Sequence, residues 1–122
     1  MEEEVYKLKE VAKVNTKYID FYREIKDKKK LVDHMHQLFT YACLVGIKEE
    51  RKYEGSKPDT ICNIGNIESN NLDVIKGIVL MKEDPENGEE LLKLIQEYAD
   101  GGIETLMTEY KNEGTLRLDK YI

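Results

Sequence analysis

The sequence contains few of the residues that most often carry chemistry or cross-link a small protein. Its 122 residues include no tryptophan, two histidines, two cysteines and two prolines. No apolar run approaches the ~20 residues that a membrane-spanning helix needs. The first residues, Met1–Glu4, are acidic and no apolar stretch follows them, which is unlike a secretory signal. We therefore expect a cytoplasmic protein with no membrane span.

The two cysteines do not form a recognisable motif. Cys43 lies in an apolar segment beside Ala42 and is expected to be a small core residue, while Cys62 lies in an isoleucine-rich stretch. Without C-x-x-C spacing the pair predicts neither a zinc site nor a redox site. The sequence does not exclude a disulfide between them, although a reducing cytoplasm disfavours one.

Patterns typical of catalysis and cofactor binding are also missing. The sequence has no G-x-G-x-x-G, no G-x-x-x-x-G-K-[ST] and no G-x-S-x-G. His34 and His36 are two residues apart, so on a helix they would point in nearly opposite directions and could not bind one metal ion. The acidic residues of 83–90 surround a turn and a helix start, where carboxylates stay hydrated. We expect no enzymatic activity, no cofactor and no metal site.

Helical periodicity is what the sequence does have. Apolar residues recur at helical spacing in segments 5–14, 18–25, 31–47, 72–82, 89–99 and 103–112. This pattern predicts one mainly α domain over residues 1–122, a compact bundle of about five or six helices. Segment 31–47 is the most apolar and is expected at the centre, with Gly46 as its C-terminal cap. Residues 1–14 form either the first helix or a loosely attached arm.

Two segments do not fit a regular helix. Segment 61–67 has isoleucine at every third position, broken by asparagine and glycine, which predicts irregular structure that anchors isoleucines in the core. In the tail, 114–122, Leu116 and Leu118 alternate with charged residues. This alternation favours either a short C-terminal strand or an arm for a partner.

The net charge of −6 is unevenly distributed. Residues 1–57 carry a charge of +2, and residues 58–122 carry −8. The candidate contacts for a nucleic acid or a partner are the basic residues on either side of segment 31–47 and one tyrosine among them: Lys26, Lys28, Lys29, Lys30, Lys48, Arg51, Lys52, Tyr53 and Lys57. They form one face only if the fold brings the two ends of that segment together. The alternative is that each cluster is a solvated loop edge.

Two stretches, LFTYACLVGIKEERK (38–52) and QEYADGGIETL (96–106), point to a family when taken in this order and spacing. They resemble the small accessory proteins associated with bacterial DNA-phosphorothioation (Dnd) systems, over roughly residues 18–112. The resemblance implies a compact helical protein encoded beside DNA-modification and restriction machinery, without an established enzymatic role. It transfers no catalytic residue. Gly101 and Gly102 interrupt the helical pattern of the second stretch, which predicts a hinge between two helices there.

Three hypotheses follow. The first is a non-enzymatic accessory protein of a DNA-modification or antiphage defence system, which acts through contacts with other proteins of that system. The second is a small regulatory dimer that binds DNA or RNA through the basic residues. The third is an enzyme whose site assembles from the carboxylates of Glu97, Asp100 and Glu104, beside the two glycines. A homodimer is also an open expectation, to be judged by exposed apolar residues on the C-terminal helices.

Overall fold

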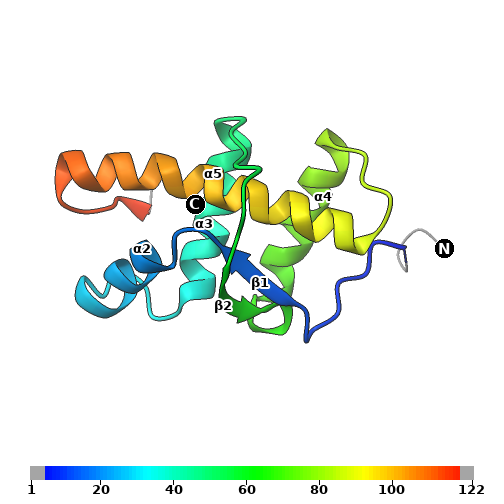
Figure 1. Ribbon diagram of the computed structural model, residues 1–122, viewed down its shortest axis with the longest axis horizontal. Helices are drawn as coiled ribbons and strands as arrows, with labels where there is room; N and C mark the ends of the chain where they lie inside the picture. Colours follow the sequence, from blue (N-terminus) through cyan, green and yellow to red (C-terminus); the bar gives the residue numbers. More distant parts are fainter. Residues whose placement is uncertain (1–4, 119–122) are drawn as a thin grey trace.

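The computed structural model describes residues 5–118 (Figure 1). Within this range the chain forms four α-helices and one two-stranded antiparallel sheet. In chain order the elements are β1 (Lys13–Thr16), α2 (Ile19–Arg23), η1 (Glu24–Lys28), α3 (Met35–Lys48), β2 (Asp59–Asn63), η2 (Ile64–Asn66), α4 (Ser69–Lys82) and α5 (Gly88–Glu113). Element η1 is a π-helical turn that continues α2, and η2 is a turn of 3-10 helix. No helix in the described range is long and apolar enough to cross a membrane.

The predicted all-helical bundle of five or six helices is wrong. The segment 5–14 ends in strand β1, whose residues are alternately exposed and buried, with Val14 and Thr16 inside. Strand β1 pairs with β2 in a register that places Val14 opposite Cys62 and Thr16 opposite Asp59. A partner strand thus decides the structure here, because tertiary contacts override a weak local helical pattern.

Helices α3 and α5 form the centre of the core, where α3 crosses behind α5 (Figure 1). This confirms the central place predicted for segment 31–47. Their fully buried side chains include Leu38, Phe39, Ala42 and Cys43 from α3, and Leu91, Ile95, Ile103 and Leu106 from α5. Cys43 and Cys62 are both free thiols, and Cys43 is buried as expected.

The predicted glycine hinge is also wrong, because Gly101 and Gly102 lie inside the continuous helix α5. A Cβ atom built on Gly102 would stand 1.8 Å from the carbonyl oxygen of Ala42, and one on Gly46 would stand 1.9 Å from that of Tyr98. Likewise, Gly46 does not cap α3, which continues to Lys48. These glycines let the two helix backbones touch at their crossing, which no other residue would permit.

The remaining elements close the core around this crossing. Tyr22 and Ile25 of α2 and η1 are fully buried, as their helical spacing predicted. Ile64 and Ile67 are 3% and 5% exposed, which confirms that segment 61–67 anchors isoleucines in the core. That segment is more regular than expected, since it contains part of β2 and the whole of η2.

Residues 114–118 fold back on α5. Gly114 caps the helix with a positive φ of 75°, and Leu116 is buried at 6% exposure. Residues 114–118 form no strand, so the strand predicted for this tail is not found there. The rest of the predicted tail, residues 119–122, lies outside the described residues.

Candidate functional site: the groove between α2 and α5

The first basic cluster lies on η1 and the turn after it. The ammonium group of Lys26 is 2.9 Å from the carboxylate of Asp27, and that of Lys28 is 3.5 Å from Glu24. Lys29 extends its ammonium group over the ring of Tyr110 on α5, 6.0 Å from the ring centre. Lys30 is exposed and has a φ of 53°, which ends the helical turn.

The second cluster lies where the chain leaves α3. The guanidinium group of Arg51 is 3.0 Å from Glu104 on α5 and also donates to the hydroxyl of Thr105. Lys52 is 3.3 Å from Glu83. Lys57 donates to the backbone carbonyls of Tyr53 and Gly55, both at 2.9 Å, and so closes its own loop. Lys48 is exposed and makes no contact of this kind within residues 5–118.

One arrangement recurs three times among these residues: a tyrosine hydroxyl donates to a glutamate, which also pairs with a cation. The three triads are Tyr18–Glu104–Arg51, Tyr98–Glu83–Lys52 and Tyr110–Glu24–Lys28. Each triad ties α5 to a segment that lies far away in the sequence. Of the predicted contact cations, Lys26, Lys28, Arg51 and Lys52 are paired with carboxylates of the same chain.

Two of these pairs join the two oppositely charged parts of the chain. The weakly basic residues 1–57 and the strongly acidic residues 58–122 meet along α5, where Arg51 pairs with Glu104, and also at the end of α4, where Lys52 pairs with Glu83. A third pair, at 3.6 Å, joins the two parts in the opposite sense, from Lys82 to Glu50.

A groove of about 490 Å³ runs between α2 and α5. It is lined by Tyr18, Phe21, Arg51, Glu104, Met107, Thr108, Tyr110 and Lys111. Arg51 of the second basic cluster lines it beside Glu104, and Lys29 of the first cluster lies over Tyr110. Arg51 is thus the candidate contact residue that lines the groove, and Lys29 contacts one groove wall, the ring of Tyr110, without lining the groove itself. The other candidate contact residues are not among its lining residues.

The groove walls are aromatic and held in place. The rings of Phe21 and Tyr110 meet edge to face, with 5.8 Å between their centres. The hydroxyls of Tyr18 and Tyr110 are fixed by Glu104 and Glu24, at 2.5 Å and 2.9 Å. The side chain of Met107 remains 37% exposed although it is apolar. A surface with these features can bind an apolar or aromatic side chain without first being ordered.

Beside the groove, the ring of Tyr53 lies near two cations, which are not its sequence neighbours Arg51 and Lys52. The ammonium groups of Lys57 and Lys17 lie 5.3 Å and 5.6 Å from the centre of its ring. Its ring also meets that of Tyr18 at 5.9 Å. Such stacking of cations on tyrosine stabilises the loop and leaves a small basic, aromatic surface.

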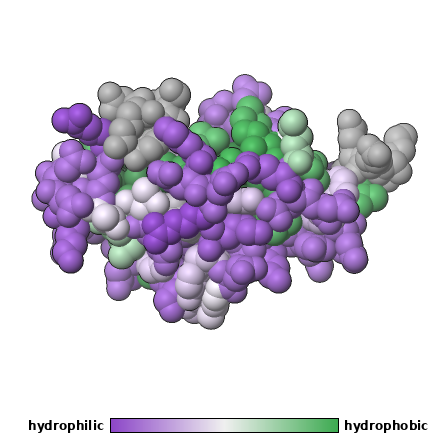
Figure 2. Space-filling model, turned by 90° about the horizontal axis from the view of Figure 1, so that it is seen from above, coloured by the Kyte–Doolittle hydropathy of each residue, from purple (hydrophilic) through white to green (hydrophobic). Residues whose placement is uncertain are grey.

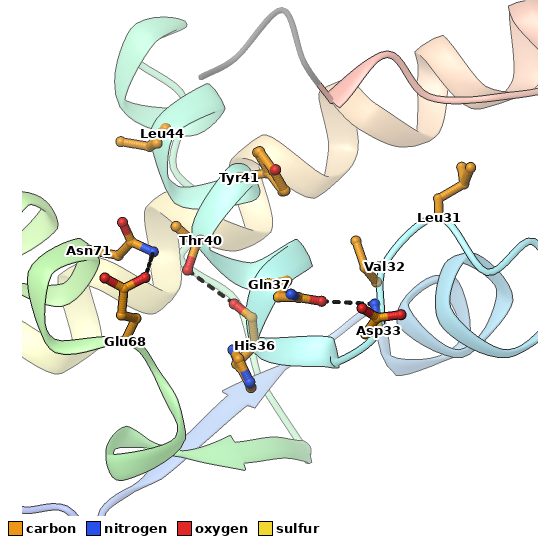
Figure 3. A pocket seen from close by; sticks show the side chains of 10 residues that line it. All are labelled: Leu31, Val32, Asp33, His36, Gln37, Thr40, Tyr41, Leu44, Glu68 and Asn71. Carbon is orange, nitrogen blue, oxygen red and sulfur yellow. Dashed lines mark hydrogen bonds between the residues drawn. The ribbon is translucent and has the colours of Figure 1, made fainter.

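A second pocket, of about 390 Å³, lies between α3 and the start of α4 (Figure 3). It contains His36, together with the carboxylates of Asp33 and Glu68. These two acids lie on opposite sides of the pocket in Figure 3, and Glu68 accepts a hydrogen bond from Asn71. The pocket therefore has no converging set of catalytic groups.

The two histidines are closer than a helix alone would place them. Their rings stack with 5.1 Å between the centres, because His34 precedes α3 in an extended conformation. The pKa of His36 is lowered, first by its partial burial and then by the neighbouring His34. Across residues 5–118 no group of three or more histidine, cysteine, aspartate or glutamate side chains is arranged to bind a metal ion.

The three carboxylates proposed for an enzyme site are held by contacts within the protein or are buried. Asp100 is fully buried and accepts hydrogen bonds from the hydroxyl of Thr16 and from the backbone N–H of Lys17. Glu104 is held by Tyr18 and Arg51. Glu97 is 2% exposed, and burial raises its pKa. The arrangement around Asp100 fixes the corner between β1 and α2.

Sequence reasoning missed Tyr18, Phe21 and Tyr110 as site residues, because their helical spacing assigned them to the core. The prediction that they are core residues is confirmed for Phe21, which is 9% exposed, but Tyr18 and Tyr110 are only half-buried. The missing signal was the pair of glutamates, Glu104 and Glu24, that accept hydrogen bonds from the hydroxyls of Tyr18 and Tyr110 and lie far from them in the sequence. No family model, no curated protein and no solved structure matches this chain.

The triads make an acid-sensitive contribution to stability that can be measured. The hydrogen bond from Tyr98 and the ion pair with Lys52 lower the pKa of Glu83 from its ordinary value of 4.5, against the opposing effect of partial burial. A lowered folded-state pKa stabilises the protein above pH 4.5, and this contribution is lost as the pH falls through the folded-state pKa.

We expect Glu83→Gln to reduce the free energy of unfolding at neutral pH by about 1 kcal/mol. The difference in the free energy of unfolding between the variant and the wild type should shrink as the pH falls below the ordinary glutamate pKa of 4.5. Urea unfolding at several pH values measures it, with the exposed Glu89→Gln as the matched control. An equal effect of both substitutions at every pH would contradict the triad.

Proposed function

We propose that this protein is a non-enzymatic accessory protein that binds a segment of another protein in the groove between α2 and α5. The observation that carries the proposal is the groove itself, whose tyrosine walls are preorganised and whose lining Arg51 is already paired. Tyrosine, arginine and methionine are enriched in protein interfaces, and tyrosine and arginine dominate their binding energy.

The pairing of the cations supports a protein partner over a nucleic acid. Binding to phosphates requires clustered cations that are free to neutralise them. Here Arg51, Lys52 and Lys28 already have carboxylate partners, and the whole chain carries a net charge of −6. A polyanion would have to displace these partners and approach an acidic protein.

One observation favours the second candidate, a small protein that binds DNA or RNA. Lys17 and Lys57 lie beside the ring of Tyr53. An aromatic ring next to cations is a surface on which a nucleobase can stack. Lys30 and Lys48 are exposed cations without a carboxylate partner in the described part of the chain. We retain this candidate because one experiment separates it from the first.

The cellular setting of the proposal rests on the resemblance to accessory proteins of DNA-phosphorothioation systems. We propose that the partner is another protein of such a DNA-modification or antiphage defence system, in the cytoplasm. Of the two stretches that carry the resemblance, residues 96–106 lie in an uninterrupted helix, and their glycines serve the α3–α5 crossing. A crosslinked partner from outside any DNA-modification or defence system would contradict this setting.

The proposed groove is tested by site-specific photo-crosslinking in the cell. A photoreactive amino acid replaces Met107 in the groove, and in the matched control it replaces Val11, which is 76% exposed elsewhere. We expect a defined protein to crosslink from position 107 and not from position 11. Thr108→Arg, which fills the groove, should abolish this product, whereas Thr115→Arg outside it should not. The same products from both positions would contradict the proposal.

Binding to a random-sequence DNA duplex separates the two candidates. We expect no binding at about 50 mM salt, where phosphate contacts are strongest. Salt-sensitive binding that is lost in Lys29→Glu and Arg51→Glu would instead support the nucleic-acid candidate. A control with Lys93→Glu, on the exposed side of α5, shows whether the loss is specific or follows from net charge alone.

A further inference from the structure

Three lysines lie in or beside the groove between α2 and α5 and form no ion pair in the described part of the chain. Lys111 is one of the lining residues. Lys29 lies 6.0 Å from the ring centre of Tyr110, a groove wall, and Lys17 lies 5.6 Å from that of Tyr53 beside the groove. All three lysines are exposed, so their ammonium groups can contact a bound molecule.

The groove has little negative charge of its own to balance these lysines. Of the described residues, Glu104 alone contributes a carboxylate to the lining, and it is already held by Tyr18 and Arg51. Glu24, which accepts a hydrogen bond from one groove wall, is paired with Lys28. The groove is therefore a local excess of positive charge on a chain of net charge −6. Such an excess favours an occupant that carries negative charge.

The positive groups lie toward the two ends of the groove, with an apolar side chain between them. Arg51 pairs with Glu104 at one end, and Lys111 lines the other end, seven residues further along α5. Seven helical residues span about 10.5 Å. Met107, which is 37% exposed, lies between them on the same face, because the spacing from position 104 is i, i+3, i+7. The groove thus fits an apolar group between two negative ones.

We propose that the partner segment bound in this groove is a short acidic helix, with an apolar residue at its centre and an acidic residue one turn to either side. This inference rests on the proposed function. A helix repeats its face every seven residues, over about 10.5 Å, which matches the separation of Glu104 and Lys111 along α5. One acid then lies near Arg51 and Lys17, and the other near Lys111 and Lys29.

The walls of the groove favour a helix over an extended segment. They are formed mainly by α2 and α5, whose backbone groups are largely hydrogen-bonded within each helix. They therefore offer no strand edge to which an extended segment could be added, whereas a helix satisfies its own backbone groups.

The spacing of the charges favours a protein segment over a nucleic acid. Each strand of a duplex carries about one phosphate per 3.4 Å, so phosphates would also lie over the apolar side chain of Met107. In Figure 2 the side chains around the second half of α5 are mainly hydrophilic, so the apolar contact is small and surrounded by polar ones. We expect an isolated peptide to bind with a dissociation constant of about 10–100 µM.

A displayed library of helical peptides, randomised at eight consecutive positions, tests the inference on the full chain. Peptides are kept that bind the wild type and do not bind Thr108→Trp, which fills the groove without adding a charge. We expect the selected peptides to carry acidic residues seven positions apart with an apolar residue between them. Groove-dependent peptides without these acids would overturn this inference and leave the groove as a binding site. No groove-dependent peptide at all would overturn both this inference and the proposed function.

Charge exchange between the protein and a selected peptide tests the contact at one end of the groove. Lys111→Glu should weaken binding about fivefold or more in fluorescence anisotropy, whereas Lys93→Glu, the same change elsewhere on α5, should have little effect. When each acid of the peptide is replaced in turn by lysine, one of the two peptides should recover its affinity for Lys111→Glu. Equal losses in both variants, or no recovery, would overturn the proposed arrangement.

Competition with a random-sequence DNA duplex separates the acidic helix from a nucleic acid. The duplex should not displace the selected peptide at about 150 mM salt, because the excess of positive charge is small and interrupted by an apolar side chain. Displacement that is lost in Lys111→Glu and retained in Lys93→Glu would assign these lysines to phosphates and overturn the proposal.

Discussion

Replacing Gly102 by alanine is expected to destabilise the protein by about 3 kcal/mol, although alanine is the better helix former. The added Cβ would lie 1.8 Å from the carbonyl oxygen of Ala42 and 2.9 Å from the backbone nitrogen of Gly46. Both are backbone atoms inside α3, so they cannot turn away as a flexible side chain would. Helices α3 and α5 would have to separate at the centre of the core, where packing is tightest.

Gly77 provides the matched control for this result. It too lies in a helix, but a Cβ there would meet nothing within 4 Å. Gly77→Ala should therefore stabilise the protein by about 0.5–1 kcal/mol, through the higher helical propensity of alanine alone. Urea unfolding compares the two substitutions. If both substitutions stabilised the protein, the result would contradict the close backbone contact between α3 and α5.

Removing the carboxylate of Asp100 is expected to destabilise the protein by about 2 kcal/mol. In Asp100→Ala the hydroxyl of Thr16, which is fully buried, and the backbone N–H of Lys17 lose their acceptor. The loss of two hydrogen bonds exceeds the gain from no longer burying a charge, because the donors are left unpaired. Asp100→Asn keeps one acceptor and should have a smaller effect. Asp84→Ala, at an exposed aspartate, should change the stability little.

The pH dependence of this effect has a definite sign. Burial raises the pKa of Asp100 above its ordinary value of 3.8, and the hydrogen bonds from Thr16 and Lys17 oppose the rise only in part. The native state therefore binds a proton more tightly than the unfolded chain does. The contribution of Asp100 to stability is greatest below pH 3.8 and decreases as the pH rises through the folded-state pKa.

Asp100→Asn removes this pH dependence. The free energy of unfolding of the variant should therefore fall further below that of the wild type near pH 4 than near pH 7. The measurement is urea unfolding of both proteins between about pH 4 and about pH 7. A difference that grows with pH would show that the hydrogen bonds, and not burial, control the pKa of Asp100.

The helices that the sequence predicted correctly are those whose periodic face packs on another helix. Segment 31–47 is close to α3, and the turn at 84–88 begins α5 with Asn87 accepting from the N–H of Glu90, as expected for a helix cap. The β1 strand could not be predicted in the same way. Its four residues are too short for a clear alternation, and their partner strand lies near residue 60.

The glycines show a different limit of sequence reasoning. In a sequence, a pair of glycines in a helical pattern indicates a break. In the structure the backbone of α3 passes Gly102, and the backbone of the segment after α3, at Arg51, passes Gly101. The absence of a side chain at Gly102 therefore brings two helices together. Local sequence does not distinguish these two uses, because the second depends on Gly46 and Ala42 more than 50 positions away.

The groove was equally hidden, since its parts come from three separate segments. Tyr18, Arg51 and Glu104 meet only after the chain has folded. What the sequence did show was the cations and the opposite charge of the two parts of the chain. It could not show that several of these cations would form ion pairs with carboxylates of the same chain.

The contacts of the amino-terminal part set the order in which this protein can fold during its synthesis. Tyr6 donates to the carbonyl of Pro85, 79 positions later, and Tyr18 and Glu24 contact residues 86 positions later. While the chain is still being synthesised, the segments of β1 and α2 leave the ribosome before α5, against which they pack. Because such distant contacts form slowly, the first segments translated must wait for nearly the last, and a transcript cut short before α5 would yield a product open to proteolysis.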